Sequence, residues 1–353
     1  MQNKQLDQFR EERQPINGVG NIMKNRTYEE LDVPYFTDRT RASLKIQEGC
    51  NAFCTYCIIP YGRGPSRSLR PNEVVTQVQK LVDSGVQEIV VTGTNIGHYG
   101  FEWEPKLSIA FIELLDLILS KTKLKRLRLS SLDPAETSQE LIDFMNTQDK
   151  LCPHFHLSLQ SPHSKILKLM KRKYDFNEVQ KCFERMQKVK APVGGVFIGM
   201  DLITGFPGES EEIYQWSVEA LKQLDWTRMH VFPYSERKST PATKLPGVVY
   251  PHIRKERSKE LSKLSLQRLK SHYQSVLDQS CDLEDVLLES KTKGPDGSDC
   301  WISGLTKNYL RVHLKINDQE QLKSLENTIV RVKPQSLVID QSASEVAFLS
   351  TLQ

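Results

Sequence analysis

Three cysteines in one short segment constrain this chain more than any other feature of its sequence. Cys50, Cys54 and Cys57 follow a C-x3-C-x2-C spacing in a chain of 353 residues that has seven cysteines in total. Thiolates this close together can hold one metal centre from a single loop. The preceding Leu44-Lys-Ile46 alternates as a strand does. The cysteine loop should therefore follow the carboxyl end of a strand, where α/β proteins place their chemistry.

The kind of metal centre follows from the number of ligands. A tetrahedral zinc site takes four ligands, and no other cysteine or histidine lies within ten residues of the group. A four-iron cluster held by three thiolates leaves one iron open to a substrate. The spacing favours one 4Fe-4S cluster, with a structural zinc loop as the alternative. An odd, uneven set of cysteines also indicates a reducing compartment, so we expect a cytoplasmic protein.

Strand and helix patterns alternate from Arg39 to about Pro251. Helical periodicity or capping signals occur at 71–84, 108–120 and from Asp133, and strand patterns at 88–92, 124–129, 154–160, 196–204 and 228–233. With the strand at Leu44 these make six βα units. Such alternation predicts an α/β fold with a parallel sheet, here an incomplete (β/α)6 barrel.

The composition changes after Pro251. One long basic helix is followed by short β-rich runs at 285–288, 300–302, 310–314 and 328–332, which predict a small C-terminal β-barrel. We expect three parts: 1–38, a polar linker or the remnant of a lost N-terminal domain; 39–276, the core; and 277–353, the β domain. No run of about 18 apolar residues predicts a membrane span.

Two strings carry a family resemblance. RTRASLKIQEGCNAFCTYCIIPYGRGPSRS (39–68) resembles the radical S-adenosylmethionine (SAM) methylthiotransferases, most of all those acting on tRNA threonylcarbamoyladenosine, and Gly304–Val312 resembles the TRAM RNA-binding module. The resemblance implies a (β/α)6 core, a 4Fe-4S cluster on Cys50, Cys54 and Cys57, and SAM as cofactor. It also implies transfer of a methylthio group to C2 of the adenosine next to the anticodon. The expected partners are a tRNA anticodon stem-loop and an electron donor such as flavodoxin or ferredoxin, and we expect a monomer.

The resemblance further places SAM contacts at the ends of successive strands. The residues it implies are Tyr56, Gly93, Thr94, Ser130, Ser131, Gln160 and Asp201. For each position an ordinary βα turn or helix cap is the alternative.

The sequence departs from the family before Cys50. Relatives have an N-terminal domain whose own three cysteines hold a second 4Fe-4S cluster, and here no cysteine precedes Cys50. The ligands of the second cluster are therefore missing from this sequence. A degenerate relative that binds tRNA and cleaves SAM without inserting sulfur is the alternative function, and a zinc-binding RNA protein is a third.

Basic residues suggest where RNA binds. The net charge is only +4, but the charge is clustered, and clustering matters more for nucleic acid than the total. We predict RNA contacts at Arg254, Lys255 and Arg257 of the long helix and at Lys307, Tyr309 and Arg311 of the TRAM-like string. Five further cations lie within 121–128, where a solvated face is the alternative.

Overall fold

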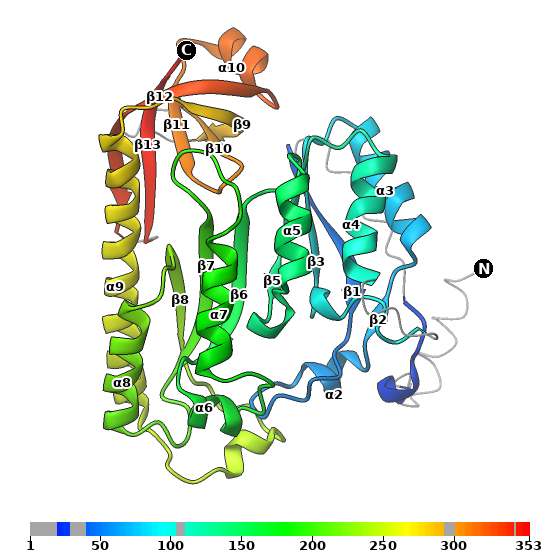
Figure 1. The fold of residues 1–353 in the computed structure, drawn as a ribbon, viewed down its shortest axis with the longest axis vertical. Coiled ribbons are helices and arrows are strands. Elements are labelled where there is room, and N and C mark those ends of the chain that lie inside the picture. The colour runs from blue at the N-terminus through cyan, green and yellow to red at the C-terminus, as the bar shows by residue number, and fades with distance from the viewer. Residues whose placement is uncertain (1–19, 29–39, 104–109, 293–300, 342–343) are drawn as a thin grey trace, which may run out of the picture.

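A curled sheet of six parallel strands forms the larger part of the molecule in the computed structural model, and a closed barrel is stacked on one end of it (Figure 1). The structure describes residues 20–28, 40–103, 110–292, 301–341 and 344–353. Most of the predicted linker 1–38 lies outside these residues. The predicted fold class, an α/β half-barrel followed by a small β-barrel, is confirmed.

The strands of the half-barrel lie side by side in the order in which they occur along the chain. Its strands are β1 (Arg41–Glu48), β3 (Glu88–Gly93), β4 (Arg126–Leu129), β5 (Ser131–Leu132), β6 (His154–Gln160), β7 (Phe197–Thr204) and β8 (Arg228–Pro233). Only Ser130 separates β4 from β5, so the two count as one interrupted strand and the half-barrel has six. The first part, β4, pairs with β3, and the second part, β5, pairs with β6. The short β2 (Arg67–Ser68) adds an antiparallel edge to β1.

Most helices pack on the outside of the curl through an apolar face. These are α3 (Pro71–Asp83), α4 (Ala110–Lys121), α5 (Gln139–Thr147), α7 (Phe176–Met186), α8 (Glu211–Lys222) and α9 (Pro251–Asp278), while the short α2 (Ile59–Arg63) and α6 (Ser164–Leu169) lie at one end of the strands. The predicted start of α4 at Ser108 lies outside the described residues. Alternate strand residues such as Ile89 and Val91 are buried beneath these helices.

The predicted helix start at Asp133 opens a shorter element than expected. Asp133 caps a single 3-10 turn, η3 (Pro134–Glu136), with Glu136 bonding back to the Asp133 amide, and α5 begins later with Ser138 as its cap. The Ser138 side chain accepts a hydrogen bond from the Leu141 amide at 3.2 Å. The Asp133 carboxylate also binds the guanidinium of Arg172, a partner outside its own turn.

The C-terminal unit is a closed five-stranded barrel in the order β10-β11-β13-β12-β9. Its elements are β9 (Leu283–Thr292), β10 (Trp301–Leu305), β11 (Arg311–Lys315), α10 (Gln319–Leu325), β12 (Ile329–Asp340) and β13 (Glu345–Leu352). Four of the strands coincide with the predicted runs, although Cys300 lies outside the described residues. Strand β13 was not predicted, and it closes the barrel by pairing with β11 and β12.

Helix α9 belongs to both units. Its buried residues recur every three or four positions from Arg254 to Val276, so they form one stripe along the helix. Leu261 packs in the core of the half-barrel, whereas Leu269 and Tyr273 pack in the core of the small barrel. None of the described helices is long and apolar enough to span a membrane.

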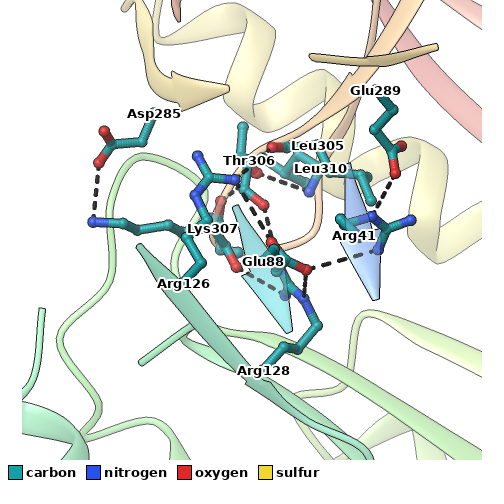
Figure 2. A network of polar contacts seen from close by, with 11 residues as sticks. Arg41, Glu88, Arg126, Arg128, Asp285, Glu289, Leu305, Thr306, Lys307 and Leu310 are labelled. Atoms are coloured by element: carbon teal, nitrogen blue, oxygen red, sulfur yellow. Dashed lines mark hydrogen bonds and ion pairs between the residues drawn. The ribbon is translucent and has the colours of Figure 1, made fainter. Parts of the chain in front are cut away.

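A buried ionic network joins the small barrel to the amino ends of the core strands (Figure 2). The Glu88 side chain is fully buried on β3 and accepts two hydrogen bonds from Arg128, at 2.7 and 3.0 Å. Arg41 and Arg126 each place a nitrogen 3.7 Å from the same carboxylate. Although burial alone would raise it, the pKa of Glu88 is lowered by Arg128 and Arg41. One carboxylate therefore stays ionised among three arginines.

The arginines also bind the backbone of the small barrel. Arg126 donates to the Leu305 carbonyl at 3.1 Å and Arg128 to the Lys307 carbonyl at 2.9 Å. From the other side, the Asn308 amide donates to the carbonyls of Val193 and Gly195, at 3.0 and 2.8 Å. We call this surface the barrel end of the half-barrel. The opposite surface, at the carboxyl ends of the strands, holds the cysteine loop and is called the cysteine end.

Candidate functional site

The cysteine loop, residues 49–58, is fixed on both sides by neighbouring segments. It leaves β1 at Glu48 and enters α2 at Ile59. The Thr55 hydroxyl donates to the Leu169 carbonyl at 2.8 Å, and its amide donates to the Met170 carbonyl at 3.1 Å. The Thr55 carbonyl accepts from the amide of Ala242 at 2.9 Å. The loop is thus held between the end of α6 and the 3-10 turn η4 (Pro241–Lys244).

The surroundings of the three sulfurs fit the ligands of an iron–sulfur cluster. Cys54 is buried, and Cys50 and Cys57 are half-buried. The Ala52 amide donates to the Cys50 sulfur at 3.4 Å, and the Arg172 guanidinium donates to the Cys54 sulfur at 3.3 Å. Such donors stabilise the negative charge that thiolates carry to a cluster. Burial raises the pKa of the Cys50 and Cys57 thiols, so cluster binding would release protons.

Within the described residues, no group of three or more histidine, cysteine or carboxylate side chains is placed to hold a single metal ion. What the loop offers is three thiols, of which that of Cys54 lines a cavity. That arrangement suits a cluster larger than one ion, with room for a second molecule beside it.

A pocket of about 280 Å³ opens next to Cys54. Its lining includes His98, Asp133, Glu136, Arg172 and Tyr174. Arg172 is central because it bonds the Cys54 sulfur, the Asp133 carboxylate, the Ser158 carbonyl and the Tyr174 hydroxyl. The pocket therefore combines a sulfur ligand, a fixed cation and two carboxyl groups.

Glu136 is the unusual carboxyl group of this pocket. Burial, and next the charge of Asp133, raises the pKa of Glu136 to about 7. Its Oε2 accepts from the Asp133 amide at 2.8 Å, and its Oε1 lies 3.3 Å from Nε2 of His98. Burial, and next Lys173, lowers the pKa of His98. At neutral pH Glu136 is therefore about half protonated, while His98 is largely neutral.

The predicted SAM residues lie on adjacent strand ends. Gly93 ends β3, and a Cβ there would meet Gln47 at 2.9 Å. Gln47 is fully buried, accepts from the Asn95 amide at 2.9 Å and donates to the Ser66 hydroxyl at 2.9 Å. The glycine is therefore required by close packing of β1 and β3. Thr94 follows it directly and is half-buried.

The next predicted residues continue around the curl. Ser130 and Ser131 lie at the break between β4 and β5, and the Ser130 hydroxyl is buried with no hydrogen-bond partner among the described residues. Gln160 ends β6 with a φ of +66°. The Tyr56 ring lies edge-on to Phe206, with centroids 6.4 Å apart, and burial raises the pKa of Tyr56. The structure thus brings these residues to one end of the half-barrel.

Asp201 has a partner that the sequence did not suggest. Its Oδ1 lies 3.0 Å from Nε2 of His156 on β6, and the His156 ring lies 5.5 Å from that of His230 on β8. A Cβ at Gly199 would lie 3.1 Å from the His156 ring. The three side chains form a polar group on the inner face of the half-barrel.

The predicted RNA residues are not together, and two of them are wrong. Arg254 and Arg257 are only 3% and 6% exposed. Arg254 binds the Tyr234 and Val249 carbonyls and Glu236, and Arg257 binds Glu209 and Glu211. Their charges are used inside the protein and are not available to phosphate. Lys255, between them, is exposed.

The three residues of the TRAM-like string lie at the barrel end. The Tyr309 ring packs 4.4 Å from the His154 ring and 5.0 Å from the Arg128 guanidinium. Lys307 forms an ion pair with Asp285 at 3.1 Å and Arg311 one with Glu289 at 3.7 Å. Arg126 and Arg128 belong to the basic run 121–128, for which a solvated face was the alternative to RNA binding. Both are buried at the barrel end.

Sequence reasoning missed Arg172, His98 and Glu136 as site residues. Arg172 lies within Lys168-Leu-Met-Lys-Arg-Lys-Tyr174, a basic run that alone indicates a surface helix. A positional signal existed, because this run begins in α6, the short helix that follows the carboxyl end of β6. Glu136 was interpreted as part of a helix cap. That interpretation accounts for the hydrogen bond from the Asp133 amide to its carboxylate, but not for the burial of the carboxylate in the pocket.

Known proteins similar to this chain share the cysteine loop region. The Radical SAM superfamily profile matches residues 44–220. Threonylcarbamoyladenosine tRNA methylthiotransferase MtaB of Bacillus subtilis is 43% identical over 311 residues, 88% of this chain and 67% of that protein. The enzyme of the same name from Aquifex aeolicus is 37% identical over 87% of this chain and 70% of its own length.

More distant similarities follow. A tRNA-2-methylthio-N(6)-dimethylallyladenosine synthase of Clostridium botulinum is 32% identical over 81% of this chain and 61% of that protein. Among solved structures, coproporphyrinogen III oxidase from Escherichia coli aligns with a TM-score of 0.49 and 14% identity, over 78% of this chain and 68% of its own.

Proposed function

Because the chain belongs to the tRNA methylthiotransferases of the radical SAM superfamily, we propose that it adds a methylthio group to C2 of N6-threonylcarbamoyladenosine next to the anticodon. The observation that carries the proposal is the 43% identity to the Bacillus subtilis enzyme over 88% of this chain. The cysteine loop and the pocket beside Cys54 support it. In this superfamily a reduced 4Fe-4S cluster cleaves SAM and supplies a 5′-deoxyadenosyl radical.

We assign the cluster to Cys50, Cys54 and Cys57. The Ala52 amide and the Arg172 guanidinium orient the sulfurs of Cys50 and Cys54. Thr55 holds the loop against α6 and η4. SAM contacts are assigned to the strand ends, at Tyr56, Gly93, Thr94, Ser130, Ser131 and Gln160. Asp201 holds His156 on the inner face, and through it shapes the space that receives the adenosine.

The remaining assignments complete the proposal. Residues 39–276 form the catalytic domain and 277–353 the TRAM-like domain, since α9 ends at Asp278 and β9 begins at Leu283. The protein works as a cytoplasmic monomer with a flavodoxin or ferredoxin as electron donor. Lys255 remains a candidate RNA contact because it is exposed.

Three measurements on one preparation test this function. Anaerobically reconstituted protein should hold one four-iron cluster, and the variant Cys50→Ala/Cys54→Ala/Cys57→Ala should lose its iron and the absorption near ~400 nm. Reduced protein should convert SAM to 5′-deoxyadenosine. Mass spectrometry should find the methylthio product on a stem-loop that carries threonylcarbamoyladenosine and none on a dimethylallyladenosine stem-loop.

Each measurement can contradict a different part. Full iron content in the cysteine variant would overturn the ligand assignment. Equal product on both stem-loops would overturn the substrate assignment. SAM cleavage without methylthio product would support the alternative of a relative that does not insert sulfur.

A further inference from the structure

The cysteine end carries exposed cations that the protein does not neutralise. The elements concerned are α2, α6 with the turn after it, the segment 235–250 between β8 and α9, and the first turn of α9. Their exposed cations are Arg63, Lys165, Lys168, Lys171, Lys173, Arg237, Lys238, Lys244 and Lys255. Among the described residues, none of these takes part in an ion pair. They are free to bind an anionic partner.

Several acidic groups on the same end are neutralised by arginines. Glu236 is paired with Arg254, and Glu211 with Arg257. Asp133 is paired with Arg172 in the pocket. The arginines that the sequence suggested for RNA thus act indirectly, because they cancel negative charge near the exposed lysines. This leaves the cysteine end with an excess of positive charge.

The C-terminal barrel has the opposite charge balance. Residues 277–353 contain eight lysines and arginines against twelve aspartates and glutamates, whereas residues 1–276 contain forty against thirty-two. Since phosphate contacts dominate RNA affinity, an acidic domain docked by its Thr306–Tyr309 loop is poorly suited to hold RNA. The loop that resembles an RNA-binding signature is packed against the half-barrel.

Exposed aromatic side chains accompany the cations. On β8, Met229 is buried beneath α9, so His230 and Phe232 face the inner surface of the half-barrel. Phe232 lies at the cysteine end of this strand and is 53% exposed, and Tyr250 is 66% exposed. Aromatic faces among cations are typical of surfaces that bind unpaired nucleotides.

We infer that RNA docks on the cysteine end, with phosphates on Arg237, Lys238, Lys244 and Lys255 and an unpaired base against Phe232. The inference rests on the proposed function, which requires an RNA base to reach this end. Enzymes that modify a base take it out of the stack and bind it against aromatic side chains. Phe232 is placed to do this where a base would enter the half-barrel.

An acidic electron-carrier protein would also be attracted to these cations. The exposed aromatics favour RNA, because bases stack on them. The two partners can be separated by experiment, since reduction by dithionite needs no carrier protein.

The test compares two triple variants of the reconstituted protein. One is Arg237→Ala/Lys238→Ala/Lys244→Ala on the cysteine end. The matched control is Lys315→Ala/Lys323→Ala/Lys333→Ala on the small barrel, where all three lysines are also exposed. The affinity for an anticodon stem-loop is measured from 50 to 300 mM KCl. The cysteine-end variant should flatten the slope of log K against log salt by about 2, at roughly 0.7–0.9 per phosphate contact, and the control should keep the wild-type slope.

Phe232→Ala provides an independent measurement. It should weaken binding about tenfold through lost stacking and leave the salt slope unchanged, while Phe232→Tyr should retain affinity. Unfolding temperature and iron content check that all variants are folded.

The inference is overturned if the barrel variant flattens the slope, or if the cysteine-end variant keeps it. It is also overturned if that variant binds RNA normally but loses reduction by flavodoxin and not by dithionite. A wild-type protein that binds the stem-loop but never modifies it refutes the proposed function alone, because the slopes still identify the docking surface.

Discussion

Both ends of the half-barrel are rich in basic residues, but they use the charge in opposite ways. At the barrel end, Arg41, Arg126 and Arg128 surround the buried carboxylate of Glu88, and Arg126 and Arg128 also donate to barrel carbonyls. At the cysteine end, lysines such as Lys238 and Lys244 are exposed. A paired, buried cation contributes to structure, whereas an exposed, unpaired cation is available to a partner. Burial and pairing, and not local charge density, separate the two roles.

One carboxyl group at the barrel end, Glu88, and one at the cysteine end, Glu136, also differ in protonation. The pKa of Glu88 is lowered against the effect of burial by Arg128 and Arg41. The pKa of Glu136 is raised to about 7 by burial and by Asp133. The barrel end therefore keeps a fixed charge, and the cysteine end keeps a carboxyl group that titrates near neutral pH.

The largest expected effect is at the barrel end. Glu88→Gln removes the counter-charge of the buried Arg126 and Arg128 and one of the two carboxylate partners of Arg41, so it should lower the free energy of unfolding by about 3–5 kcal/mol, measured by urea denaturation. Because the folded pKa of Glu88 is below its unfolded value, its contribution is present above about pH 4.5 and is lost as the pH falls through the folded pKa.

The matched control is Glu284→Gln, whose carboxylate pairs with Arg331 while 64% exposed. It should change stability by less than about 0.5 kcal/mol. Equal effects of the two variants would show that the buried network does not hold the barrel.

A smaller loss of stability is expected from Arg254→Ala. The change removes bonds to the Val249 and Tyr234 carbonyls, at 2.7 and 2.9 Å, and to Glu236. We expect a loss of about 2–3 kcal/mol in unfolding free energy and no change in the salt slope of RNA binding. The neighbouring Lys255→Ala should do the reverse, with stability unchanged and the slope flattened by roughly 0.7–0.9. A flattened slope in Arg254→Ala would restore its assignment to RNA.

The titration of Glu136 should give the cysteine end a pH-dependent stability. Because its folded pKa exceeds the unfolded value, the protonated form is favoured by folding, and stability should fall as the pH rises from about 4.5 to about 7. Glu136→Gln should lack this fall, so it should gain on the order of 1–3 kcal/mol relative to wild type between pH 5 and pH 8. Urea denaturation at both pH values measures the difference, and parallel curves for the two proteins would contradict the raised pKa.

The smallest effect is expected at the solvent edge of the barrel end. Lys307→Met removes an ion pair with Asp285, which is 50% exposed. Stability should change by less than about 1 kcal/mol, and RNA affinity should be unaffected. The Lys307 backbone carbonyl still accepts from Arg128 in this variant. A loss of RNA affinity, measured by filter binding, would return the RNA surface to the small barrel.

The sequence was sufficient for the local features of the catalytic core. The spacing of Cys50, Cys54 and Cys57 and the alternation of strands and helices depend on residues close together in the chain. The roles of Arg126 and Arg128 depend on carbonyls at Leu305 and Lys307, about 180 positions later. Patterns within one helix or strand contain no information on such partners.

Some errors could have been avoided. Arg254 and Arg257 lie seven and four positions before Leu261 on the same helical face, so the apolar stripe of α9 already indicated their burial. The acidic balance of residues 277–353 could also be counted from the sequence, and it bears on the RNA contacts predicted there, which stay a prediction. The pocket around Arg172 could not be deduced, because it depends on a side chain that reaches from one strand connection to another.

The ionic network at the barrel end has a consequence for synthesis on the ribosome. Arg126 and Arg128 are translated long before the Leu305 and Lys307 carbonyls to which they donate in the finished protein. At roughly 5–20 residues per second, 180 residues take on the order of 10–35 s. During that interval the guanidinium groups of Arg126 and Arg128 in the nascent half-barrel lack their carbonyl partners. The contacts between the half-barrel and the small barrel therefore form late. The time at which they form depends on the rate of translation and not on how fast the half-barrel itself folds.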